Sequence, residues 1–461
     1  MSALSRPWNR LSLAGKVVLP LLFLVAALTL ALLVGVALGP IPYLIDLAYD
    51  TIVANLGIVR FIGAVTAILL LTVPTAFIII YLEMKVIALM NLRIGPNRVG
   101  PWGTLQSAAH GFKVLGKEDF TPTGADVPVF TLAPAVVYLA SVMAFLVLPF
   151  APGLVGADMN IGLLYFFAVG SLGVVGLMMA GWASFNKYSL LGGLRAAAQI
   201  ISYEIPLTLS VVGVVLLAGT LSLNAIVLEQ SGSFLDWFIW RQPLGFLIFF
   251  IAATAEGSRT PFDLTEADSE IVAGFATEYS GMRFGFFFFA EYVNVFLLSA
   301  LTVVLFFGGW NAPFDLGGLL ARIGLSVDPA LAPGQLGIGL LFGVALVPPI
   351  VILLIALPIW AFRSDVPFWK ALVIGFLLFN VLAVGALLLW ATASFEAVEG
   401  LIWFFAKTYV FVVVFVWMRG TLPRVRIDQL MGFAWKWLLP AALVNLFITA
   451  AAIVVVRQVQ G

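Results

Sequence analysis

Long apolar segments without charged residues constrain this chain more than any other feature. Runs such as Leu21–Val36 and Val295–Leu305 contain no charged side chain, and a helix needs about 20 such residues to cross a bilayer. Apolar segments with at most one charged residue each lie at residues 17–39, 59–82, 130–150, 163–182, 200–220, 244–256, 284–308, 337–362, 370–392, 401–418 and 435–456. The sequence therefore predicts an all-α polytopic membrane protein with about eleven transmembrane helices. The segment 244–256 is the shortest of them.

Composition supports helices in a membrane. Hydrophobic residues make up 62% of the chain and charged residues only 10%, which is incompatible with a water-soluble domain of this length. The strands of a membrane β-barrel would alternate in hydrophobicity, whereas these segments are continuously apolar. The first segment is too long for the core of a signal peptide, so we interpret it as a retained helix.

The basic residues indicate an orientation. Lys and Arg accumulate in the cytoplasmic loops of membrane proteins. If the N-terminus is cytoplasmic, the outer side keeps only Arg60, Arg241, Arg322 and Arg457, with Lys407 inside a span, and the other basic residues fall on the inner side. We therefore predict a multi-pass protein with a cytoplasmic N-terminus.

The content of Cys and His excludes several kinds of redox centre. The chain has no Cys and one His, so it cannot hold a thiolate-ligated iron–sulfur cluster, a disulfide or a bis-histidine haem. It also lacks the strand–turn–helix context of a glycine-rich nucleotide-binding motif. We expect no metal site and no redox cofactor in this chain, so any electrons must reside on partners or on a substrate.

The loop at residues 83–128 combines turns with an amphipathic segment. Two Gly-Pro pairs, Gly95-Pro96 and Gly100-Pro101, indicate turns. From Thr104 onward one helical face is apolar and the other is polar. The apolar face comprises Leu105, Ala108, Ala109, Phe112 and Leu115, and the polar face comprises Gln106, His110, Lys113 and Lys117. This pattern predicts an interfacial helix; by pattern alone, a helix whose lysines contact anionic lipid is equally compatible.

A second loop, at residues 256–283, is rich in acidic residues. Its charged residues, with Glu291 just beyond it, are Glu256, Arg259, Asp263, Glu266, Asp268, Glu270, Glu278 and Arg283. Crowded carboxylates raise the pKa of at least one member. A solvated acidic loop is the alternative, but the interleaved apolar residues, such as Phe262 and Phe275, favour burial.

Glu204 and Lys407 are two of the ionisable residues that lie within predicted spans. Glu204 lies near the inner end of a span, and carboxylates in such positions generally face a bundle interior and mark proton or ion paths. Lys407 lies in a later span, where a proton-relay role and a structural role are equally compatible with the pattern.

Several ordered motifs resemble one family, the H-subunit of bacterial NADH-quinone oxidoreductase (respiratory complex I), whose mitochondrial counterpart is NADH dehydrogenase subunit 1. The resemblance extends from about residue 59 to 456. It rests on Arg93–Pro101, Gly181–Tyr188, Ser202–Glu204, Glu256–Glu270, Glu278–Tyr279, Ala290–Tyr292 and Arg419–Leu430. So many motifs in a fixed order are far more specific than any single short motif.

The resemblance implies a membrane subunit of a proton-pumping NADH:quinone oxidoreductase in a bacterial inner membrane. Such a subunit lies where the hydrophilic arm joins the membrane arm, helps to form the quinone tunnel and couples quinone reduction to proton translocation. The implied partners are the hydrophilic quinone-site and iron–sulfur subunits, antiporter-like membrane subunits and membrane lipid. Quinone would be the substrate, and NADH, FMN and iron–sulfur clusters would bind to partner subunits. We expect no catalytic residue in this chain and no nucleic-acid partner.

The resemblance also implies roles for particular residues. The quinone-binding region would comprise Glu83, Lys85, Arg93, His110, Asp263, Glu266 and Glu270. The proton path would comprise Glu204, Glu256, Glu278 and Glu291, with Arg195 and Arg259 as cationic partners. Closely spaced carboxylates can take up and release protons in coupled steps. Three positions depart from the family pattern: Met84 replaces a usual Arg, His110 replaces a commonly acidic residue, and Asp268 replaces a usual Glu.

The resemblance divides the chain into four parts, with about eight helices in the family core and about three extra ones. Residues 1–58 form an N-terminal extension with one extra helix, and residues 59–309 form the core membrane domain with both polar loops. Residues 310–400 form an insertion with about two extra helices, and residues 401–461 form the C-terminal core helices.

A different class of function remains as an alternative. A related membrane subunit could anchor a hydrogenase or ferredoxin-linked complex and couple ions without binding quinone. The loop Arg93–Pro101 and the stretch Glu256–Tyr279 favour the quinone enzyme. A secondary transporter would be expected to show internal repeats, and the sequence shows no repeat.

Overall fold

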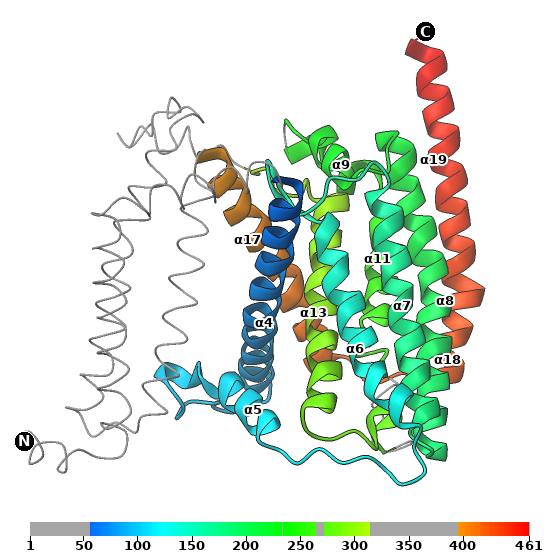
Figure 1. The fold of residues 1–461 in the computed structure, drawn as a ribbon. Coiled ribbons are helices and arrows are strands. Elements are labelled where there is room, and N and C mark those ends of the chain that lie inside the picture. Colours follow the sequence, from blue (N-terminus) through cyan, green and yellow to red (C-terminus); the bar gives the residue numbers. More distant parts are fainter. Residues whose placement is uncertain (1–55, 233, 264–271, 314–394, 461) are drawn as a thin grey trace, which may run out of the picture. The chain divides into compact units, whose positions relative to one another are not determined.

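The computed structural model describes residues 56–232, 234–263, 272–313 and 395–460 (Figure 1). The chain divides into two compact units, Met1–Ala64 and Val65–Gly461. In the first unit only the opening residues of helix α4 are described, so the account below concerns the second unit. The predicted extra helices at 17–39, 337–362 and 370–392 lie outside the described residues, as does most of the predicted insertion.

Helices form nearly all of the regular structure in the described residues. The longer ones are α4 (Leu56–Met90), α6 (Val127–Ala144), α7 (Gly162–Ala183), α8 (Lys187–Ala218), α11 (Pro243–Glu256), α13 (Gly281–Phe306), α17 (Phe395–Thr421) and α19 (Leu439–Gln460). The shorter ones are α5 (Gln106–Leu115), α9 (Leu223–Glu229), α10 (Phe238–Arg241), α18 (Ile427–Phe433) and the π-helix η5 (Ala434–Leu438). Four short 3₁₀ segments complete them: η1 (Pro101–Gly103), η2 (Phe145–Val147), η3 (Phe234–Asp236) and η4 (Gly274–Ala276).

Seven helical segments among the described residues are long and apolar enough to cross a membrane, and α11 is a shorter apolar helix. Each predicted span between residues 59 and 308, and each one after residue 400, coincides with one of these elements. The prediction of an all-α polytopic membrane protein is therefore confirmed.

One predicted span ends earlier than expected. Apolar composition predicts a helix throughout the segment 130–150, but the helical structure ends with η2 at Val147. Strand β1 (Pro149–Ala151) follows and pairs with antiparallel strand β2 (Leu154–Val155). Pro149 has no backbone N–H to donate, so it cannot continue the helical hydrogen bonds. Apolar composition alone does not indicate this boundary.

Capping residues determine where α8 begins and ends. The side chain of Asn186 accepts a hydrogen bond of 2.9 Å from the backbone N–H of Tyr188, which starts the helix at Lys187 rather than at the predicted residue 200. Gly219 ends it in a left-handed conformation with φ of +69°, and its N–H donates to the carbonyl of Val215. The helix therefore carries Arg195 and Glu204 on the same rigid element.

Helix α13 is the most buried of the spanning helices, and α19 is the least. Helix α13 contacts α6, α11 and α17, and α8 contacts α7, α11 and α19 (Figure 1). The buried rings of Phe145 and Phe296 stack with a centroid separation of 5.8 Å between η2 and α13. Just before α11, Gln242 donates a 2.6 Å hydrogen bond to Thr449 and so attaches α19 to the start of α11.

Helices α5 and α9 lie at opposite ends of this bundle, and we refer to these as the α5 end and the α9 end (Figure 1). Ser107 of α5 is buried against the bundle, whereas Phe112 and Leu115 are exposed. Part of the apolar face predicted for this helix therefore points away from the protein, as expected for a helix at a membrane interface or beneath a partner.

Candidate functional site

Four charged side chains from four different segments form a buried network, which we call the ionic cluster: Glu83, Arg259, Glu291 and Arg419. Arg259 Nη1 lies 3.2 Å from Glu83 Oε2, and Arg259 Nη2 lies 3.2 Å from Glu291 Oε1. Glu83 also pairs with Arg419. Arg259 is thus the centre of a network in which two carboxylates face two guanidinium groups.

Different helices position these residues. Glu83 lies on α4, Glu291 lies on α13, and Arg419 is a basic residue in the last turn of α17. Arg259 follows the end of α11, where its backbone N–H donates to the carbonyl of Thr254. Its guanidinium lies 4.4 Å from the centroid of the Tyr292 ring, a cation–π geometry that holds the side chain in place.

Because the ionic cluster is largely buried, each of its charges must be paired with an opposite charge. Arg259 and Glu83 are only 4% and 8% exposed, and a charge so deeply buried is costly unless it is paired. Burial alone would lower the pKa of the Arg259 guanidinium, but the carboxylates of Glu291 and Glu83 outweigh it and hold that pKa above its usual value. Buried ion pairs are rarely the most stable solution for a protein interior, and a network of this kind within a membrane protein indicates a functional site.

A second ion pair, between a buried carboxylate and an exposed arginine, continues the network toward the surface. Arg424 Nη2 lies 3.1 Å from Asp263 Oδ2, and Asp263 is buried. The backbone N–H of Val425 donates to the carbonyl of Pro261, which fixes the connection after α17 against the loop after α11. This loop is therefore attached both to the ionic cluster and to the end of α17.

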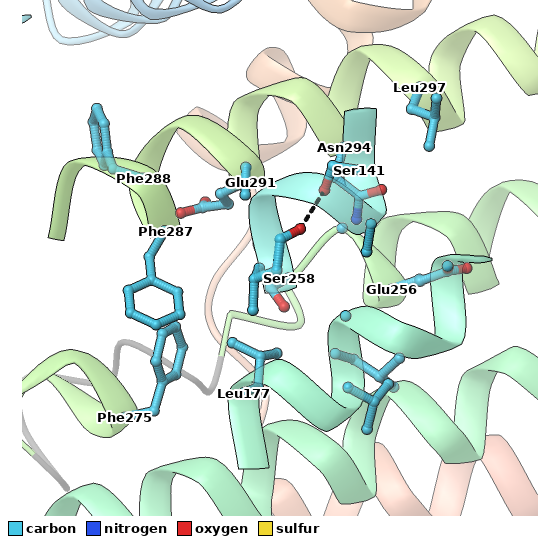
Figure 2. A pocket seen from close by; sticks show the side chains of 18 of the residues that line it. Ser141, Leu177, Glu256, Ser258, Phe275, Phe287, Phe288, Glu291, Asn294 and Leu297 are labelled. Atoms are coloured by element: carbon cyan, nitrogen blue, oxygen red, sulfur yellow. Dashed lines mark hydrogen bonds between the residues drawn. The ribbon is translucent and has the colours of Figure 1, made fainter. Parts of the chain in front are cut away.

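A cavity of about 110 Å³ adjoins the ionic cluster between α6, α7, α8, α11 and α13. Glu291 and Glu256 both line it, with Ser258 between them in the view of Figure 2. Its lining also includes three aromatic side chains, Phe275, Phe287 and Phe288 (Figure 2). A cavity of this size with several polar groups can hold water molecules.

Glu256 connects the cavity to a further carboxylate. Its Oε2 atom is buried and has no hydrogen-bond partner within the part of the chain that the structure describes. Glu256 interacts electrostatically with Glu204, which is half-buried on α8. Acidic groups therefore follow one another across the bundle from Glu83 on α4, through Glu291 and Glu256, to Glu204 on α8.

The structure thus brings together six of the predicted site residues: Glu83, Asp263, Arg259, Glu291, Glu256 and Glu204. Other predicted residues lie elsewhere. Arg93 is exposed, and His110 is exposed and contacts Gln106 on its own helix at 3.1 Å. Lys85 lies 5.9 Å from the ring centroid of Tyr81, and Arg195 is half-buried on α8.

Glu278, predicted to belong to the proton path, contacts a capping residue of α8. Asn186 Nδ2 donates a 2.6 Å hydrogen bond to Glu278 Oε1. Nearby, the hydroxyl of Ser189 donates to the carbonyl of Phe275, so this half of the acidic loop is attached to the beginning of α8. Glu266 and Glu270 lie outside the described residues.

A model of the NADH dehydrogenase family matches residues 62–450 of this chain. The chain belongs to this family. It is 42% identical over 391 residues to the NADH-quinone oxidoreductase H-subunit of Brevibacillus brevis, an alignment that covers 84% of this chain and 92% of that protein. The H-subunit of Anoxybacillus flavithermus is 44% identical over 369 residues, 80% of this chain and 86% of that protein. The H-subunit of Geobacillus kaustophilus is 43% identical over 385 residues, with coverages of 83% and 91%.

For this member of the NADH dehydrogenase family, reasoning from sequence missed several residues of the site. Arg419 and Arg424 complete the ion pairs, and Ser258 and Asn294 line the cavity. The basic residue at the end of the apolar helix α17 was a usable signal for Arg419, because such a charge requires a partner or water. Ser258 and Asn294 had no comparable feature in the sequence that would have marked them as site residues.

Gln199 is another residue that the sequence did not single out. It is buried on α8, and its Nε2 atom donates hydrogen bonds of 2.7 Å to the carbonyls of Ala255 and Phe262. These two carbonyls flank Arg259 in sequence. Gln199 therefore holds in place the loop that carries the centre of the ionic cluster.

We expect Gln199→Leu to destabilise this loop by about 1–3 kcal/mol for each carbonyl that loses its donor. The measurement is the temperature at which the purified chain unfolds in mild detergent, which should fall. Gln106→Leu is the matched control, because in the described structure the side chain of Gln106 forms a hydrogen bond only with exposed His110. Equal unfolding temperatures for both variants would mean that Gln199 does not anchor the loop.

Proposed function

We propose that this chain is a membrane subunit of a proton-translocating NADH-quinone oxidoreductase in a bacterial cell membrane, with its N-terminus and its α5 end on the cytoplasmic side. In this role it helps to form the quinone-binding site and couples quinone reduction to proton movement. Its partners are the hydrophilic quinone-site and iron–sulfur subunits and the antiporter-like membrane subunits. The family match and the names of the relatives support this proposal.

The main observation in support of the coupling role is that the cavity adjoins the ionic cluster. Reduction of a quinone to a quinol consumes two electrons and two protons, so negative charge develops at the quinone unless protons arrive. Charge at one end of a row of interacting carboxylates changes the protonation of the next. Glu291 is shared by the ionic cluster and the cavity, so it can transmit such a change from the α4 side toward Glu256.

The redox cofactors belong to partner subunits in this proposal. The chain has no Cys and a single His. Among the described residues there is no group of three or more His, Asp or Glu side chains that could hold a metal ion. NADH, FMN and the iron–sulfur clusters would therefore deliver electrons from the hydrophilic arm, and this chain would supply the membrane side of the quinone site.

Purification of this chain from its native membrane under mild conditions tests the proposal. We expect nucleotide-binding and iron–sulfur subunits to co-purify, together with NADH:quinone activity that is sensitive to an inhibitor of the quinone site. Co-purification with hydrogenase subunits would instead assign the chain to the alternative class, a membrane anchor that couples ions without quinone.

His110 provides a test of where the quinone enters. It lies on α5, where the family resemblance places the quinone-binding region, and it is exposed. We expect His110→Asp to change the KM for quinone by about two- to fivefold, the effect of a partly screened charge, while kcat stays constant. Steady-state assays over a range of quinone concentrations measure both constants. An unchanged KM would place α5 outside the quinone path.

A further inference from the structure

A second hollow lies at the α5 end of α18 and α19, beside the loop that follows Arg259. Its floor is apolar and is formed by Pro261, Phe262, Leu430 and Phe433, and its volume is about 530 Å³. Phe262 and Leu430 are held together because Tyr203, which packs against Phe262, donates its hydroxyl hydrogen to the carbonyl of Leu430 at 2.9 Å. We call this hollow the α18 groove.

The rim of the α18 groove is basic. Lys436 is its only charged lining residue among the residues that the structure describes, and its side chain is exposed. Arg426, just before α18, adds an exposed positive charge nearby in the chain. Asp263, the acidic residue that directly follows Phe262, is already paired with Arg424. Asp428, two residues after Arg426, is exposed and carries the opposite charge. Among the described residues no carboxylate forms an ion pair with Lys436, so within this part of the chain the groove offers one positive charge above an apolar floor.

The flanking residues are typical of a membrane interface. Trp435 and Trp437 are 49% and 71% exposed on either side of Lys436, just before α19 and within the candidate span Ile427–Val456. Tryptophan and lysine are enriched where acyl chains meet headgroups. This composition is typical of a site that contacts a phosphate and the first methylene groups of a phospholipid.

The backbone beside the groove is irregular, and one of the lining residues has no side chain. Residues Ala434–Leu438 form a π-helix between α18 and α19, and such segments occur frequently at functional sites. Gly432, which lines the groove, has no heavy atom within 4 Å of the position that a Cβ atom would take. A side chain at this position would therefore project into open space in the groove without a clash.

From these observations we propose that the α18 groove is a binding site for an anionic phospholipid, whose phosphate contacts Lys436 and whose acyl chain covers the apolar floor. Basic pockets beside membrane helices on the cytoplasmic side bind anionic headgroups in this way. The site lies on the surface of the bundle and shares no lining residue with the cavity of the proposed proton path. It does not depend on the proposed quinone and proton roles.

Two substitutions in the intact complex test the site. We expect Gly432→Phe to fill the groove and remove the lipid, and Lys436→Gln to lower its occupancy by about fivefold, the effect of one basic side chain beside an anionic headgroup. Lipids that remain on the purified complex in mild detergent are counted by native mass spectrometry. Lys436→Arg keeps the charge, and Ala451→Phe adds the same bulk to an exposed position of α19 outside the groove. Both controls should retain the lipid.

A photoreactive phenylalanine analogue in place of Trp437, an exposed aromatic residue that already lines the groove, identifies the occupant directly. An adduct with an anionic phospholipid supports the proposal. An adduct with another protein subunit would overturn it, since the groove would then be a protein interface. Equal lipid content in Gly432→Phe, Lys436→Gln and both controls would overturn it as well.

Discussion

Replacement of Arg259 by Met should eliminate NADH:quinone activity and strongly reduce the amount of this chain in the assembled complex. Arg259 is the only residue of the ionic cluster that pairs with both carboxylates among the described contacts. Its loss leaves half-buried Glu291 without its ion pair and buried Glu83 with Arg419 as its remaining partner. Breaking a buried pair on one side costs up to about 3–5 kcal/mol. Native gel electrophoresis of the solubilised membrane measures assembly, and NADH oxidation with quinone or with an artificial acceptor measures activity.

Two further variants separate assembly from coupling. The double variant Arg259→Met/Glu291→Gln removes both charges, so we expect assembly to recover while quinone activity stays low. Arg241→Met serves as the matched control, because Arg241 pairs with Asp236 at 3.6 Å with both side chains about half exposed, and exposed pairs contribute at most about 1 kcal/mol. If Arg259→Met retained assembly and NADH:quinone activity to the same extent as Arg241→Met, the ionic cluster would not be essential to the complex.

The sequence predicted the spanning helices well because their signal is local. A continuous apolar segment such as the one that became α13 requires a helix wherever it meets lipid, since the backbone must satisfy its own hydrogen bonds. Boundaries set by single residues were harder to predict. Asn186 starts α8 earlier than hydrophobicity alone indicated, and Pro149 follows the last helical turn after α6.

The candidate site was only partly predictable because its contacts join residues that are distant in the chain. Glu204 was found by its position in an apolar span and the loop carboxylates by their crowding, whereas Glu83 was assigned only by the family resemblance. Glu83 pairs with Arg259 and Arg419, which lie far from it in sequence. Pairing of this kind depends on how α4, α11 and α17 pack. Glu278 is a further example, because its hydrogen bond with Asn186 could not be predicted without knowing how the helices pack.

Glu256→Gln should lower quinone reductase activity and proton translocation together, by about 100-fold, the lower end of what a positioned proton-transfer side chain contributes. Glutamine keeps the size of the side chain but cannot take up or release a proton. Glu256 lines the cavity that Glu291 also lines, and it interacts with Glu204, so it lies at the middle of the acidic row. We expect Glu204→Gln to act in the same direction.

The decisive comparison is between two routes for electrons in the same preparation. If Glu256 transfers protons, electron flow from NADH to an artificial acceptor stays at the wild-type rate, because that route bypasses the membrane arm, while the quinone route slows. Glu229→Gln is the matched control, since Glu229 is exposed at the α9 end, and it should leave both routes unchanged. Wild-type quinone activity and proton translocation in Glu256→Gln would show that protons do not pass through this carboxylate. A loss of both routes would indicate damage to assembly, because a carboxylate that only carries protons cannot affect electron entry in the hydrophilic arm.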